Sequence, residues 1–392
     1  MDHQGRLKKL QQVIKEQGWE GVILFYSRDI YYFSGTAQPG YLMVRPDDFR
    51  LFVRSGLEFA LAQSSLPPEG IVAERSLEAA CGQMFPGEGG GQAVGTELDL
   101  LPVSQARFFE KALGARQLQE CSPALLNLRM VKEPEEIACL KEAGSAAHAG
   151  HSAALEALKP RVTELELAAA VENAQRLAGH EGMYFFRPLD VVMSRGPLAS
   201  GPNLSRISGV IFSITGTGLS AAVPAGPSRR ALAPGDLVLI DIPPCIRGYH
   251  ADQTRMYCLG QPPDRVALGH ERLRAVADRL TADLRPGMTA GDAYEMAIDE
   301  ASARGVLDSF MRFPTGVKAH FVGHGIGLEV SEPPLLAKEG REVLRQDMAL
   351  ALEMHLMSED GVTLKLEDTV VLTDNGCRLL TVSPREIGTP VP

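Results

Sequence analysis

Four carboxylic acids of this chain lie in or beside apolar segments that have the composition of buried β-strands. Asp241 ends the run LVLID, and Asp252 follows it by eleven residues. Glu353 lies in ALALEM and Glu367 in LKLED, fourteen residues apart. A bare carboxylate buried in an apolar sheet is costly unless a cation or a hydrogen-bond donor compensates it. The fold must therefore bring a compensating partner to these acids.

Each pair of acids is expected to lie on a β-hairpin. A connection rich in Pro and Gly separates Asp241 from Asp252, and the polar turn SEDG separates Glu353 from Glu367. Such segments between apolar runs favour chain reversal, which would place both carboxylates of a pair on one face. Thr254 shares a side with Asp252 under strand alternation, so its hydroxyl is placed to hydrogen-bond a carboxylate or a bound water.

One histidine completes the set. His324 lies in HFVGHGIG, where flanking glycines allow close backbone approach and leave the imidazole accessible. Oxygen donors with one imidazole and no thiolate suit Mn, Fe, Co or Zn in a reactive site better than a structural zinc. Four negative charges exceed what one divalent ion needs. We therefore expect two divalent ions, about 3.5–4 Å apart, bridged by carboxylates and a water of lowered pKa.

Two domains are predicted within the 392 residues. A helical segment at residues 3–17 and an apolar run at 21–26 begin an alternation of helix-like and strand-like pieces, which predicts an α/β domain over 1–128. Helices and apolar strands over 129–392 predict an α+β domain with a mostly antiparallel sheet. Two of its helices are expected to begin at Thr163 and Thr289, each with an acid three residues later.

Charge and composition exclude several classes of function. With 39 Lys and Arg against 49 Asp and Glu, the net charge of -10 disfavours a nucleic-acid partner. The sequence shows no apolar run near the roughly 18–20 residues that cross a bilayer and no signal-peptide core, so we expect no membrane partner and a cytoplasmic location. The six cysteines form no CxxC pair, which argues against a zinc knuckle or a dithiol redox motif.

Three other patterns carry weaker signals. The Gly-rich residues 86–95 are expected to form a flexible turn rather than a phosphate cradle, because no Gly-Lys-Ser/Thr follows. His148 and His151 are expected to be packed or solvated, since no third ligand is nearby. Residues 215–218 (TGTG) fail the GxGxxG pattern of a dehydrogenase.

The spaced aspartates, the segment GHGIGLEV, and the two glutamates together resemble the pita-bread metallopeptidases: prolidase, aminopeptidase P, methionine aminopeptidase and the non-metal relative creatinase. The junction LRMVKEPEEI resembles the prolidase and creatinase branch. This resemblance implies a creatinase-like N-terminal domain over 1–128 and a pita-bread catalytic domain of two pseudo-symmetric halves over 129–392. It also implies a small peptide or small-molecule substrate and a homodimer.

The resemblance also implies roles for individual residues. Asp241 would chelate one metal ion, His324 and Glu353 would bind the other, and Asp252 and Glu367 would bridge the pair. Glu353 would also accept the proton of the attacking water. His320, four residues before His324, would polarise the substrate carbonyl or stabilise the tetrahedral oxyanion.

Several positions depart from the family pattern. Ser331 replaces a usual histidine, and the segment around Pro224 lacks another. His355 stands where the family usually has Gly, and Lys365 replaces an Arg two residues before Glu367. Ser331, His355 and Lys365 are candidate substrate contacts, and we expect His355 either at the rim of the pocket or in a solvated loop. We expect metal binding to be intact and peptide handling to be altered.

The sequence leaves three functions open. The first is a dinuclear metal-dependent hydrolase that resembles Xaa-Pro peptidases and cleaves a peptide or amide C–N bond. The second keeps the metal site but acts on a creatine-, ectoine- or sulfonio-type small molecule. The third is a non-catalytic relative on an inherited fold.

Overall fold

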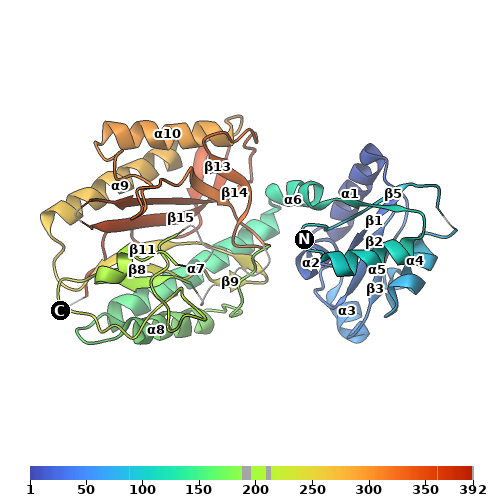
Figure 1. The fold of residues 1–392 in the computed structure, drawn as a ribbon, viewed down its shortest axis with the longest axis horizontal. Coiled ribbons are helices and arrows are strands. Elements are labelled where there is room, and N and C mark those ends of the chain that lie inside the picture. Colours follow the sequence, from blue (N-terminus) through green and yellow to red (C-terminus); the bar gives the residue numbers. More distant parts are fainter. Residues whose placement is uncertain (88, 188–195, 209–212, 360, 391–392) are drawn as a thin grey trace. The chain divides into compact units, whose positions relative to one another are not determined.

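The computed structural model describes residues 1–392 except 88, 188–195, 209–212, 360 and 391–392. The described residues form two compact units, drawn in Figure 1. One comprises Met1–Arg129 with Arg187, and the other comprises Met130–Phe186 and the described chain after residue 195. The boundary expected between residues 128 and 129 stays a prediction, because compact packing alone does not show that either part folds independently.

A mixed six-stranded sheet with the order β4-β3-β2-β1-β5-β6 forms the centre of the first unit. Its strands are β1 (Gly21–Leu24), β2 (Gly40–Val44), β3 (Phe49–Val53), β4 (Ile71–Ala73), β5 (Ala93–Thr96) and β6 (Gln117–Glu120). Its helices are α1 (His3–Gln17), α2 (Ser27–Ser34), α3 (Leu57–Gln63), α4 (Leu77–Met84), α5 (Val103–Leu113) and α6 (Ser122–Met130), with a 3-10 turn at Pro68–Gly70. Strand β1 pairs antiparallel with β2 and parallel with β5. The predicted α/β architecture and the helix at residues 3–17 are confirmed.

The Gly-rich segment ends differently from the prediction. Strand β5 begins at Ala93, so the last residues of the expected turn belong to the sheet. A Cβ at Gly95 would lie 2.9 Å from Val22 Cγ1 and 3.0 Å from Cys121 Cβ. Gly95 is therefore needed for close packing within this sheet rather than for a chain reversal.

Antiparallel sheets form the centre of the second unit. One sheet has the order β11-β8-β7 and the other β13-β12-β14-β15-β16, with a small β9-β10 ribbon between β8 and β11 in the sequence. Their strands are β7 (Leu198–Ser200), β8 (Leu237–Asp241), β9 (Cys245–Ile246), β10 (Tyr249–His250), β11 (Thr254–Cys258), β12 (Phe321–Gly325), β13 (Glu332–Ala337), β14 (Ala349–Met357), β15 (Thr363–Thr373) and β16 (Gly376–Leu379). The pairings among these described strands are antiparallel, which confirms the α+β prediction.

Four long helices cover these sheets, and a 3-10 turn (Gly201–Ser205) follows β7. Helices α9 (Asp264–Asp283) and α10 (Ala290–Ala303) lie on the side of β14 and β15, whereas α7 (Pro134–Ala157) and α8 (Glu164–Leu177) lie beyond β8 and β11 (Figure 1). Thr163 and Thr289 begin α8 and α10 with capping boxes, as predicted. Leu273 of α9 belongs to the same apolar core as Leu366, so the helices fix the strands that carry the acids.

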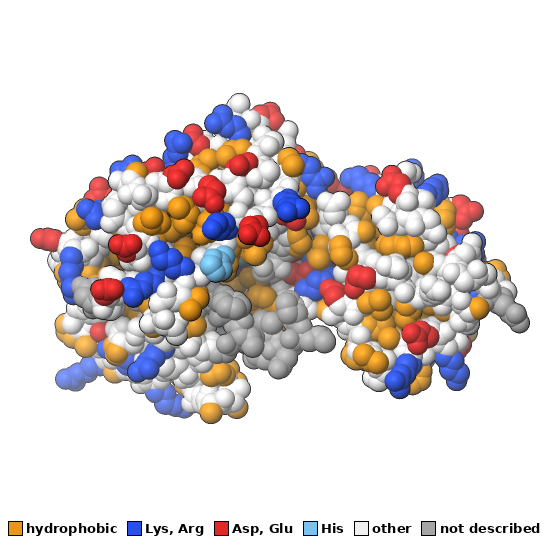
Figure 2. Space-filling view, turned by 45° about the horizontal axis from the view of Figure 1, so that its top comes forward, with side chains coloured by type: hydrophobic (Ala, Val, Ile, Leu, Met, Phe, Trp, Pro, Cys, Tyr) orange, Lys and Arg blue, Asp and Glu red, His pale blue; other side chains and the backbone are white. Residues whose placement is uncertain are grey.

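Figure 2 shows basic and acidic side chains interspersed on the face that it draws, with hydrophobic side chains between them. Among the residues that the structure describes, none of the helices combines the length and the apolar character needed to span a bilayer.

Candidate metal centre

Two antiparallel hairpins position the four acids. Asp241 is the last residue of β8 and lies opposite Thr254, the first residue of β11. Glu353 of β14 lies directly opposite Glu367 of β15, so both side chains point to the same face. The predicted hairpins are therefore both present.

A short link fixes the segment between β10 and β11 to the second hairpin. The Thr369 hydroxyl of β15 accepts a hydrogen bond from Asp252 N (2.7 Å) and donates one to Asp252 O (2.9 Å). Asp252 is thereby held beside the strand that carries Glu367. The five candidate ligands are all buried: Asp241 (5% exposed), Asp252 (6%), His324 (7%), Glu353 (8%) and Glu367 (1%).

Three of these residues are close enough to share one ion. Asp252, His324 and Glu367 each offer a donor atom, and these atoms lie within 4.8 Å of one another. His324 Nε2 lies 3.9 Å from Glu353 Oε2, so the fourth candidate borders the same group. Pairing of β12 with β14 puts His324 opposite Ala351, two residues before Glu353.

The donor atoms of this group suit a divalent metal ion. Asp252 Oδ1 is buried and has no hydrogen-bond partner in the described structure, although a buried carboxylate oxygen normally has one. His324 Nδ1 lies 3.0 Å from Gly325 O, which only accepts hydrogen bonds. In the neutral imidazole Nδ1 therefore carries the proton, and Nε2 offers a lone pair. An unsatisfied carboxylate oxygen and a free imidazole nitrogen are ligands for Mn, Fe, Co or Zn.

Lys365 lies inside the acid cluster and is only 1% exposed. Its Nζ lies 2.5 Å from Asp241 Oδ2, 2.7 Å from Glu353 Oε1 and 3.1 Å from Glu367 Oε2. It also donates to Ser213 Oγ at 3.0 Å. Its ammonium thus contacts three of the candidate ligands, and its predicted contact with substrate stays a proposal.

The pKa values of the acids reflect this crowding. Burial, together with the charges of Glu367 and Asp241, raises the pKa of Asp252 well above its usual value. Burial and the neighbouring carboxylates raise the pKa of Glu367 to about 8, against the opposing effect of Lys365. Burial also acts to raise the pKa of Glu353, but Lys365 and His324 outweigh it and the net direction is down. One lysine therefore does not keep all of these acids in their ionised forms.

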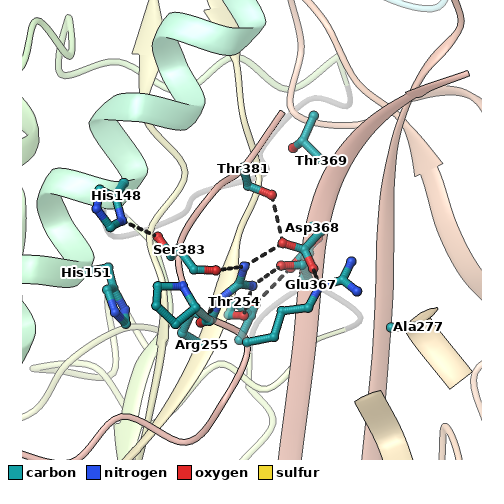
Figure 3. Close-up of polar contacts among 12 residues, drawn as sticks. His148, His151, Thr254, Arg255, Ala277, Glu367, Asp368, Thr369, Thr381 and Ser383 are labelled. Atoms are coloured by element: carbon teal, nitrogen blue, oxygen red, sulfur yellow. Dashed lines mark hydrogen bonds and ion pairs between the residues drawn. The ribbon is translucent and has the colours of Figure 1, made fainter. Parts of the chain in front are cut away.

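A buried arginine of β11, Arg255, hydrogen-bonds the part of β15 that carries Glu367. Arg255 donates to Asp368 Oδ1 (2.6 Å), Glu367 O (2.7 Å) and Ser383 O (2.9 Å), and Figure 3 shows it between β11 and β15. Thr254 Oγ1 donates to Glu367 Oε2 at 2.8 Å, as its strand position predicted. Sequence reasoning missed Arg255. The available signal was a charged residue within the apolar strand TRMYC, directly after Thr254.

The predicted substrate residues are more dispersed. His320 is exposed just before β12, and Ser331 is exposed just before β13. His355 lies within β14 and is only 3% exposed, so the expectation of a solvated loop is wrong. Its Nε2 lies 3.0 Å from Arg312 O, and burial lowers its pKa to about 4. The roles of His320, Ser331 and His355 stay proposals.

The two helical histidines have protein partners. His148 Nδ1 lies 3.2 Å from Ser383 Oγ, a contact visible in Figure 3, and His151 Nδ1 lies 2.8 Å from Tyr257 Oη. They pack within the unit, as expected.

Buried carboxylates beside an imidazole are the ligand set of a metal-dependent enzyme, and comparison with known families identifies a metallohydrolase. Residues 138–374 match metallopeptidase family M24, and residues 6–131 match the creatinase/prolidase N-terminal domain. The chain belongs to metallopeptidase family M24, because the first match alone covers more than half of it. The family and the two-part fold inferred from the sequence are therefore confirmed.

Individual relatives cover nearly the whole chain. The Xaa-Pro dipeptidase of Pyrococcus furiosus is 27% identical over 386 residues, covering 97% of this chain and 99% of that protein. The probable dipeptidase PepE of Mycobacterium tuberculosis is 31% identical over 300 residues, covering 76% and 71%. The solved Xaa-Pro dipeptidase from Bacillus anthracis has a TM-score of 0.82 at 23% identity, with 99% of both chains covered, and shows the shared fold.

Proposed function

We propose that this protein is a divalent-metal-dependent hydrolase that cleaves an Xaa-Pro bond, or a closely related C–N bond, in a small substrate. The observation that carries the proposal is the buried group formed by Asp252, His324 and Glu367, with the unpartnered Asp252 Oδ1. The Xaa-Pro dipeptidase relatives that span nearly the whole chain support the substrate class.

The proposed chemistry combines a metal ion with groups of the chain. A divalent ion held by Asp252, His324 and Glu367 would supply Lewis acidity and lower the pKa of a water. Glu353 borders that group, with its Oε2 3.9 Å from His324 Nε2, so it is placed to accept the water's proton. We assign His320 the role of hydrogen-bonding the substrate carbonyl, because its exposed side chain precedes the strand that carries His324.

Other features stay predictions from the sequence. The metal is expected to be Mn, Co, Zn or Fe, and two ions are expected from the charge of the acids and from the family resemblance. Homodimer formation and a cytoplasmic location also stay predictions, and light scattering of the purified protein measures the first.

A non-peptide substrate is the second candidate. Position 331 is a serine and the segment Pro224-Ala225 contains no histidine, whereas peptide-cleaving relatives usually have a histidine at each of these places. Loss of a proton donor or acceptor typically costs about 10²- to 10⁴-fold in rate on the substrate that needs it. This observation favours a creatine-, ectoine- or sulfonio-type compound if peptides are not cleaved.

We expect metal-dependent hydrolysis of Xaa-Pro dipeptides. The protein is stripped with a chelator, reloaded separately with Mn, Co, Zn or Fe(II), and assayed on Xaa-Pro dipeptides, longer Xaa-Pro peptides and dipeptides without proline. Turnover should require metal and should favour the Xaa-Pro substrates. Full metal loading without turnover of any peptide would contradict the peptidase assignment and leave the small-molecule candidate.

A further inference from the structure

The position of Lys365 bears on how many metal ions the protein holds. The expectation of two ions was based on the charge of four carboxylates, without a positively charged side chain among them. The structure places one cation among these acids, with its Nζ against Asp241, Glu353 and Glu367. Part of the charge that a second ion would neutralise is thus already neutralised by the chain.

Lys365 contacts some of the five candidate ligands closely and others not at all among the described contacts. The resemblance assigns Asp241, His324 and Glu353 to one ion each, and of these Asp241 and Glu353 bind the ammonium directly, at 2.5 and 2.7 Å. Asp252 makes no hydrogen bond or ion pair with Lys365 among the described contacts, and its Oδ1 is unpartnered. The described donor atoms close enough to share an ion belong to Asp252, His324 and Glu367, without Asp241 or Glu353.

The fold holds the ammonium in this place. Lys365 is two residues before Glu367 in β15, so both side chains leave the strand on the same face. Ser213 Oγ accepts a hydrogen bond from Nζ at 3.0 Å and donates one to Glu353 Oε1 at 3.2 Å. An ammonium is a compact point charge that several carboxylates can share, whereas an arginine fork pairs bidentately with one of them.

We propose that the Lys365 ammonium takes the place of one of the two divalent ions, so that each chain binds a single ion at Asp252, His324 and Glu367. Asp241 then serves as a partner of the lysine rather than as a metal ligand. The inference rests on the proposed function only for the presence of a metal, and it assigns to Lys365 the positive charge of the missing ion.

Metal stoichiometry tests this directly. Elemental analysis and titration calorimetry with Mn should give about one ion per wild-type chain and about two for Lys365→Met, which frees Asp241 and Glu353 for a second ion. Lys159→Met makes the same chemical change at an exposed lysine and should keep the wild-type value.

The outcomes separate this inference from the proposed function. Two ions in the wild type would overturn the inference and leave a metallohydrolase, whereas no bound ion would overturn both. One ion in both the wild type and Lys365→Met would show that the lysine does not set the number. If Lys365→Met does not fold, electron paramagnetic resonance of the wild type with Mn still decides. An isolated ion supports the inference, and a spin-coupled pair contradicts it.

Discussion

Replacing His324 by alanine is expected to lower kcat/KM by about 10³-fold or more and to abolish tight metal binding. His324 offers the one nitrogen in the group with Asp252 and Glu367. Without it the ion keeps only carboxylates, and a catalytic metal ion is worth several kcal/mol of transition-state stabilisation, at about 1.4 kcal/mol per tenfold in rate. Steady-state kinetics and elemental analysis of the purified variant measure both effects.

A matched histidine variant separates the metal role from general damage. His148→Ala removes an imidazole that contacts Ser383 outside the acid cluster, so its kcat/KM should stay within about threefold of the wild type. Far-UV circular dichroism checks that both variants fold. Wild-type metal content in His324→Ala would show that this histidine is not a ligand.

Replacing Arg255 by methionine is expected to lower the free energy of unfolding by about 3 kcal/mol, because it removes one of the two arginines that pair with the buried Asp368 and the donor to several buried carbonyls. Arg255 and Asp368 are 1% and 2% exposed as side chains, and the arginine also holds backbone carbonyls of Glu367 and Ser383. Thr381 and Arg385 would still donate to Asp368, but the two carbonyls would lose the Arg255 donor. Urea unfolding followed by circular dichroism measures the change.

The control for this variant is a surface arginine. Arg247 pairs with Glu142, but both side chains are more than half exposed, at 53% and 56%. Exposed pairs contribute little, so Arg247→Met should change the free energy of unfolding by less than about 1 kcal/mol. Equal losses in the two variants would show that burial of the Arg255 pair does not determine its contribution.

The strands that carry the acids could be predicted because their apolar runs and turn residues are local signals. The register that sets Glu353 opposite Glu367 confirms this reasoning. His355 was misplaced because β14 continues to Met357, so that a polar residue beyond the run ALALEM remains in the strand and becomes buried. Tertiary packing, which the local pattern does not contain, decides how far such a strand extends.

The partners of the acids were harder to predict than the acids themselves. Strand alternation places Lys365 on the same face as Glu367. It does not show that the four-carbon side chain reaches Asp241 on another hairpin. Arg255 was missed for a similar reason, since its acceptors come from β15 and from residues near the C-terminus. Such contacts depend on how separate hairpins pack.

The most direct measurement is an anomalous difference map from crystals grown with Mn. The account predicts a peak about 2.0–2.3 Å from ligand atoms of Asp252, His324 and Glu367. A map from Mn-loaded crystals with no peak at these three side chains, or with the ion bound elsewhere, would contradict it.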